Sequence, residues 1–155
     1  MSTAIVTLEG VLKTETGDPI PEGIKLYRIL AEHYRIVISS TMDFEKTDHW
    51  LRSNLIIGYA DIYDTRYFYE GQDLTERHID VAKAAGKVSL VIASEGDVCA
   101  YAITNGIASV LFTNPKFVKT KREIKAWQVV AEEVERQRLA LLDAHLSSNK
   151  SKRFE

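Results

Sequence analysis

The sequence predicts an α/β protein: a Rossmann-like, three-layer α/β/α domain with a mainly parallel five-stranded sheet, followed by a long C-terminal helix. Short apolar runs alternate with segments of helical periodicity, and this alternation is typical of a parallel sheet covered by helices on both faces. The final charged segment carries apolar residues three or four positions apart, which favours one long helix. The predicted strands lie near residues 4–8, 35–39, 55–58, 88–93 and 108–112.

Length and composition are those of one ordinary globular domain. A chain of 155 residues, 45% hydrophobic and 27% charged, can bury about two-thirds of its unfolded surface without disulfides. The formal net charge of −2 gives no general attraction to nucleic acid or anionic membranes. The single Cys99 excludes an internal disulfide and a cysteine-based zinc cluster. No apolar run approaches the ~20 residues of a membrane span, and the N-terminus lacks a signal-peptide pattern, so we expect a cytoplasmic protein with no membrane partner.

The chain opens with a strand, a glycine turn and a crossover helix. The Ile-Val-Thr run within 4–8 is typical of a buried strand, and Gly10 lets the backbone turn sharply over its carboxyl end. Ligands of α/β proteins usually bind at such an end. Pro21 stands at the start of the next helical pattern, which continues to Tyr34.

The second and third strands flank a short helix. The run 35–39 is the second strand, and a helix over 43–54 follows, with Asp43 or Thr41 near its cap. The run 55–58 directly after that helix predicts the third strand.

The second half of the domain repeats the same alternation. A helix over 74–85 ends at Gly86, a residue favoured just past a helix end. The strand 88–93, an alanine-rich helix, a turn at Gly106 and the strand 108–112 follow.

Aromatic residues gather between the predicted third strand and the next helix, with Arg66 among them. Exposed, they would form a surface for stacking bases or anchoring a protein partner. Buried, they would be the core face of a strand or hairpin, and we favour burial for most of them because strands are enriched in Tyr and Phe. The set is Tyr59, Tyr63, Tyr67, Phe68 and Tyr69.

The region after the last strand divides the chain into three parts. We expect an α/β domain over 1–118, a helix over 119–146 that packs on it or projects, and a disordered tail over 147–155. The basic residues of this tail are too few to indicate nucleic acid binding. The apolar stripe is broken at Arg138 and comprises Ile124, Trp127, Ala131, Val134 and Leu141.

The segment Thr7-Leu8-Glu9-Gly10-Val11-Leu12 resembles the first motif of the haloacid-dehalogenase-like (HAD) superfamily of phosphohydrolases, a strand followed by D-x-D-G-T/V-L. The frame, the glycine and the closing leucine match, whereas both aspartates are replaced. The resemblance places Thr7 at the position of the nucleophile and Glu9 at that of the acid/base. It covers about residues 4–115 and contains no insertion long enough for a capping domain.

The other motifs of this superfamily are matched in part. Ser39 falls where the second motif has a serine or threonine that binds the phosphoryl group, although a hydroxyl-rich turn would also cap the next helix. The lysine of the third motif has no counterpart, and only Arg66 or Arg77 stands near that place. The fourth motif, an apolar strand ending in G-D-x-x-x-D, resembles the stretch that begins at Val91. Counting places Ser94 on its first aspartate, with Glu95 and Asp97 one place from the expected acids.

The chemistry of the replaced positions argues against phosphatase activity. A carboxylate is ionised at neutral pH and serves as nucleophile and Mg²⁺ ligand, whereas a threonine hydroxyl is neutral and needs an adjacent base. Glu9 keeps an acid group but reaches one methylene further, which displaces its oxygens by more than positioned catalysis tolerates. Glu95 and Asp97 also suit the first turn of a helix, where acids are favoured.

Three functions therefore follow from the resemblance. The first is a catalytically inactive pseudophosphatase that binds a protein partner or self-associates through the 120–146 helix, with no cofactor. The second is a divergent phosphatase or nucleotidase in which Glu9, Glu95 and Asp97 hold Mg²⁺. The third is a sensor that binds a phosphate ligand at Ser39, Ser40 and Ser94 without hydrolysing it.

Overall fold

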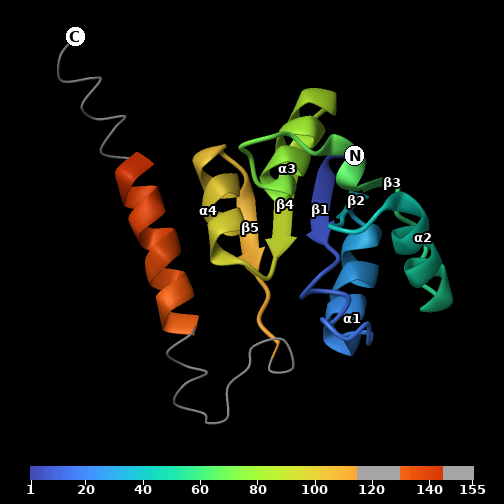
Figure 1. The fold of residues 1–155 in the computed structure, drawn as a ribbon. Helices are drawn as coiled ribbons and strands as arrows, with labels where there is room; N and C mark the ends of the chain where they lie inside the picture. The colour runs from blue at the N-terminus through green and yellow to red at the C-terminus, as the bar shows by residue number, and fades with distance from the viewer. Residues whose placement is uncertain (115–129, 145–155) are drawn as a thin grey trace.

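The computed structural model describes residues 1–114 and 130–144. Its centre is a five-stranded, entirely parallel sheet in the order β3-β2-β1-β4-β5, with β1 in the middle (Figure 1). The predicted α/β class is confirmed. The strands are β1 (Thr3–Thr7), β2 (Arg35–Ser39), β3 (Asp61–Tyr63), β4 (Val88–Ala93) and β5 (Ala108–Leu111).

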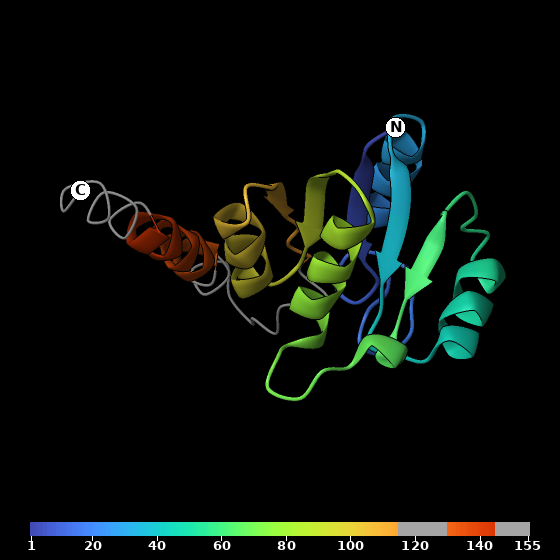
Figure 2. The same cartoon turned by 90° about the horizontal axis from the view of Figure 1, so that it is seen from above.

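Helices cover both faces of the sheet, which gives the three layers (Figure 2). Helices α1 (Pro21–Ala31) and α2 (Phe44–Ser53) pack on one face, and α3 (Leu74–Ala85) and α4 (Gly96–Thr104) on the other. Alternate residues of β1 point to opposite sides, so that Ala4 and Val6 join the first apolar layer and Ile5 the second. A short 3-10 helix, η1 (Thr65–Tyr67), precedes α3.

The helix starts follow the signals in the sequence. Pro21 occupies the first turn of α1, where a missing N–H costs nothing. Asp43 caps α2 by accepting a hydrogen bond from the backbone N–H of Lys46, and Asp73 caps α3 in the same way from Glu76. Gly10 has φ +85°, the left-handed backbone expected of the turn after β1.

The predicted strand over 55–58 is wrong, and the third strand lies at Asp61–Tyr63 instead. Leu55 adopts φ +57° just after α2, and the backbone N–H of Ile56 donates to the carbonyl of Leu51 at 2.9 Å. This is a Schellman helix ending, a motif that usually has glycine at the left-handed position. The apolar run therefore closes a helix, with Ile56 buried against Leu51 in the core and Ile57 exposed.

The described part of the C-terminal helix spans 130–144 and runs beside α4 at the outer end of the sheet (Figures 1 and 2). The predicted boundary near 118, the residues Ile124 and Trp127, and the predicted tail over 147–155 lie outside the described residues. Within 1–114 and 130–144, no helix combines the length and the apolarity that crossing a membrane requires.

Candidate functional site

The carboxyl ends of β1 and β4 meet where the chain changes direction across the sheet. The chain moves outward from β1 through β2 and β3, then returns to the other side of β1 for β4 and β5. A crevice forms beyond the strand ends at such a point, and ligands of open α/β sheets bind there. A cavity of about 40 Å³ lies at this place, which we call the edge cavity. Its lining is Thr7, Glu9, Thr41, Thr75, Ala93, Ser94, Glu95 and Val98.

Thr7 ends β1 and lines the edge cavity. The residue is 7% exposed, and its Oγ1 has no hydrogen-bond partner among the described residues. A buried hydroxyl without a partner carries a desolvation cost of about 1–3 kcal/mol. A cavity of about 40 Å³ has room for a few water molecules, since one needs about 10–15 Å³, and water is a sufficient partner for this hydroxyl.

Glu9 stabilises the turn that follows β2. Its Oε1 accepts hydrogen bonds from the backbone N–H and from the hydroxyl of Thr41, at 3.1 and 2.8 Å. The hydroxyl of Ser94 donates to the backbone carbonyl of Glu9 at 3.1 Å. These bonds connect the ends of β1, β2 and β4. Glu9, which the resemblance places at the acid/base position, therefore stabilises the fold.

Ser39 is buried and paired with a histidine that the sequence analysis missed. The side chain of His78 in α3 is fully buried, with Nε2 2.8 Å from the backbone carbonyl of Asp64 and Nδ1 2.6 Å from Ser39 Oγ. Because a carbonyl only accepts, Nε2 carries the proton and the Ser39 hydroxyl donates to Nδ1. Burial lowers the pKa of His78, which keeps the imidazole neutral. The pair resembles a nucleophile and its base, but Ser39 is 2% exposed and lines neither described cavity.

Ser40 is buried as well, and its hydroxyl is fully used. It accepts from the backbone N–H of Met42 at 3.0 Å and lies 2.8 Å from Thr47 Oγ1. The Thr47 hydroxyl donates to the carbonyl of Asp43 at 2.8 Å, so Ser40 is the donor to Thr47. The two serines expected to bind phosphate are thus bonded inside the protein.

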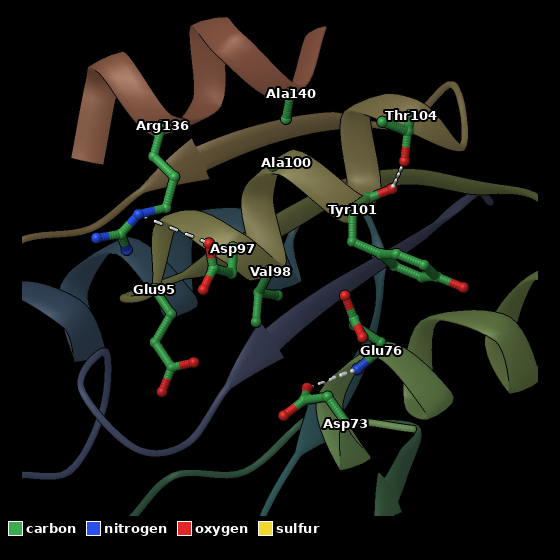
Figure 3. Close-up of a pocket in the computed structure, with 10 residues that line it drawn as sticks. All are labelled: Asp73, Glu76, Glu95, Asp97, Val98, Ala100, Tyr101, Thr104, Arg136 and Ala140. Carbon is green, nitrogen blue, oxygen red and sulfur yellow. Dashed lines mark hydrogen bonds and ion pairs between the residues drawn. The ribbon is translucent and has the colours of Figure 1, made fainter. Parts of the chain in front are cut away.

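Glu95 and Asp97 stand at the start of α4 and line a second, larger cavity of about 480 Å³ (Figure 3). Asp73 and Glu76 face them from the start of α3, and Arg136 enters from the C-terminal helix, with its Nε 3.8 Å from Asp97 Oδ1. We call this space the acidic cavity. Val98, Ala100, Tyr101, Thr104 and Ala140 complete its lining.

Negative charge accumulates around both cavities. Burial raises the pKa of Glu95, and the carboxylates of Asp73, Asp97, Glu133 and Glu9 raise it further. Burial raises the pKa of Glu76 too, again helped by neighbouring acids. A phosphate group entering the edge cavity would meet this charge without a described lysine or arginine in the lining, which opposes anion binding.

The acids proposed as Mg²⁺ ligands do not form a metal site in the part of the chain that the structure describes. No three His, Cys, Asp or Glu side chains there are grouped so as to hold a metal ion. Glu9 is engaged by Thr41, and Asp97 by Arg136. Among the described residues, this arrangement gives the metal-dependent alternative no support.

The two arginines considered as substitutes for the missing lysine are engaged elsewhere. Arg66 pairs with the buried Asp64 at 2.7 Å and stacks on Phe44 and Tyr67, with its guanidinium carbon 5.1 and 5.7 Å from the ring centres. Arg77 stacks on Tyr69 at 5.4 Å.

The predicted burial of the aromatic segment is correct only in part. Tyr63 is buried, Tyr59 and Tyr67 are half-buried, and Phe68 and Tyr69 are 69% and 61% exposed. The ring of Tyr63 lies against those of Tyr67 and His78 in the layer beside α3.

The C-terminal helix turns its polar side toward its own domain. Glu133 lies so close to Gly96 that a Cβ on this glycine would stand 1.8 Å from its Oε2, at the first turn of α4 where the helix dipole favours an acid. Glu133 also accepts from Arg136 at 2.7 Å, and the amide nitrogen of Gln137 is buried. The apolar residues Val134, Leu139, Leu141 and Leu142 are each about half exposed, at 54%, 51%, 50% and 49%.

Sequence reasoning missed two residues that shape this region, His78 and Thr41. His78 shares one side of α3 with Leu74 and Ala82, at helical spacing, and this position on an apolar side was the available signal. The contact of Thr41 with Glu9 joins residues 32 positions apart and leaves no local pattern.

No family model matches the chain, and no curated protein sequence matches it. The likeness to the HAD superfamily therefore stays a prediction from the motif positions.

Proposed function

We propose that this chain is a catalytically inactive, HAD-like α/β domain that serves as a protein-binding or assembly module through its C-terminal helix. The observation that carries the proposal is the inverted polarity of that helix. Glu133 and Arg136 contact the domain and the amide nitrogen of Gln137 is buried, while four large apolar side chains are about half exposed. A surface helix normally buries its apolar stripe, so an exposed stripe marks an interaction surface.

The hydrogen bonding at the carboxyl edge of the sheet supports the proposal that the domain is catalytically inactive. The residue at the nucleophile position is a threonine with no described base beside its hydroxyl, and Glu9, Ser39 and Ser40 are hydrogen-bonded to their own domain. Displacing these internal bonds for a substrate would cost the desolvation of buried polar groups.

A generic phosphatase assay and a thermal-unfolding scan, both with millimolar Mg²⁺, test whether the domain is inactive. We expect no turnover above background and no Mg²⁺-dependent shift, because a ligand raises stability only when it binds the folded state. Turnover that disappears in Glu9→Gln would overturn the proposal and favour the divergent phosphatase. The exposed acid Glu70 provides the matched control, Glu70→Gln.

One observation favours the sensor as a second candidate, namely the unpartnered hydroxyl of Thr7 at the edge cavity. Titration of the protein with inorganic phosphate, followed by thermal unfolding, separates the two. A saturable rise in the unfolding temperature that is lost in Thr7→Val would favour the sensor. No rise leaves assembly as the function.

A further inference from the structure

The exposed side of the C-terminal helix carries an acid and a base, Glu135 and Arg138, among its apolar residues. On this side, Glu135 and Arg138 pair with each other at 2.7 Å, and both side chains are largely exposed, at 51% and 71%. Val134 and Leu141 lie seven positions apart, which places them on nearly the same line along the helix. We call this surface, made of Ala131, Val134, Glu135, Arg138, Leu139, Leu141 and Leu142, the outer face.

We infer that the outer face binds the outer face of a second copy of this chain, with the two helices antiparallel. This inference rests on the proposed assembly function and names the partner. The point midway between residues 136 and 137 lies at equal distances along the helix from Glu135 and Arg138. A two-fold axis at that point brings Glu135 level with the partner's Arg138, and Arg138 level with the partner's Glu135.

The same register matches the apolar residues. It places Val134 level with the partner's Leu139 and about 3 Å along the axis from the partner's Leu141, and it places Ala131 level with the partner's Leu142. Leucines therefore flank small or branched side chains on both sides of the charged pair. Every contact occurs twice, as a two-fold interface requires. The paired segment of about 12 residues is about 18 Å long at 1.5 Å per residue.

A parallel pair would give a different result at the centre. In a parallel dimer, residues at the same position face each other across the seam, so Arg138 would meet the partner's Arg138. Like charges placed together at an interface oppose association. In the antiparallel arrangement, Arg138 instead lies level with the partner's Glu135, which is a complementary contact.

Sedimentation equilibrium of the full chain over a range of concentrations tests this inference with two charge-reversed variants. Glu135→Arg gives a chain with two arginines at the centre of the outer face, and Arg138→Glu gives one with two glutamates. We expect either variant alone to dissociate with a constant about tenfold higher than that of the wild type, since each homodimer contains two like-charged contacts.

Mixing the two variants is the decisive step. In the antiparallel register each arginine of one chain then faces a glutamate of the other, so the mixture forms a heterodimer with about the wild-type dissociation constant. The double variant Glu135→Arg/Arg138→Glu also restores self-association. Asp143→Arg, which changes the net charge by the same amount at an exposed position outside the outer face, leaves association unchanged and serves as the matched control.

A wild-type chain that stays monomeric at every concentration overturns the inference, and so does a dimer that ignores both charge reversals. Failure of the proposed function has a separate signature. Phosphatase turnover would refute the inactive domain whatever the oligomeric state, whereas a monomer without turnover would refute only the second copy as partner.

Discussion

The carboxyl edge of the sheet and the C-terminal helix distribute polarity in opposite ways. At the edge, Ser39 and His78 are buried and bonded to each other, and Ser40 is buried and bonded to Thr47 and to the backbone. On the helix, polar side chains contact the domain while Leu141 and Leu142 meet solvent. At the edge, the described exception is the hydroxyl of Thr7, whereas an exposed apolar stripe is typical of a surface that binds a partner. The proposed assembly through the helix rests on this difference.

We expect the largest change in stability at the carboxyl edge of the sheet, from His78→Ala. The substitution leaves the Ser39 hydroxyl without its partner, removes one of two hydrogen bonds to the Asp64 carbonyl and removes a fully buried ring. We therefore expect a loss of about 3 kcal/mol in the free energy of unfolding. Urea denaturation measures it. His49→Ala, at an exposed position of α2, should change stability by about 0.5 kcal/mol or less. Equal losses in the two variants would contradict a structural role for His78.

The same histidine predicts how stability depends on pH. Because burial holds the pKa of His78 below its ordinary value of 6.5, the unfolded chain binds the proton more readily than the folded one. The contribution of neutral His78 to the free energy of unfolding is fully present above pH 6.5. It is lost as the pH falls from 6.5 through the pKa of His78 in the folded protein. Urea midpoints at several pH values between 7.5 and 5.5 should show this slope in the wild type and a flatter profile in His78→Ala. Identical slopes would mean that His78 is accessible to protons in the fold.

We expect a smaller, local effect from Gly96→Ala, at the contact between the start of α4 and the C-terminal helix. The added Cβ would displace the carboxylate of Glu133 from the first turn of α4, which weakens the attachment of the C-terminal helix. Because a flexible side chain gives way at modest cost, global stability should change little while amide exchange in 130–144 becomes faster. Gly86→Ala is the matched control, since its Cβ would meet no described atom within 4 Å. Unchanged exchange in Gly96→Ala would show that this contact does not hold the helix.

The smallest effect concerns the charge of the acidic cavity. Burial first, and the neighbouring carboxylates second, raise the pKa of Glu95 above its ordinary value of 4.5, so its ionised form destabilises the fold at neutral pH. Glu95→Gln should therefore raise the unfolding temperature slightly at pH 7. The gain should shrink as the pH falls through the raised pKa toward 4.5, where the wild-type carboxyl becomes protonated. A gain that is constant with pH would exclude this electrostatic cause.

Two helix ends show how far the sequence could predict the fold. Helices α2 and α4 both close with a Schellman motif, the second through Gly106 at φ +76° and the first through Leu55 at φ +57°. The glycine made the end of α4 and the following strand predictable. Leucine rarely adopts a left-handed backbone, so Leu55 and the two isoleucines after it had the pattern of a strand.

The location of the candidate site could be predicted from the sequence, but the hydrogen-bond partners of its residues could not. The strand ends that carry Thr7, Glu9 and Ser94 follow from the alternation of elements, because carboxyl ends of parallel strands share one edge. The partners of Ser39 and Glu9 are 39 and 32 positions away in the sequence. Such long-range bonds depend on the packing of α3 and of the turn after β2, which no local pattern records.

Sedimentation equilibrium of the wild type beside the double variant Val134→Asp/Leu141→Asp tests assembly through the outer face. We expect the wild type to associate as its concentration rises, and the variant to remain monomeric with the same unfolding temperature at low concentration, because both side chains are about half exposed in the monomer. A wild-type chain that never associates, or a variant that unfolds at lower temperature as a monomer, would contradict it. The second result would mean that these side chains pack within their own chain.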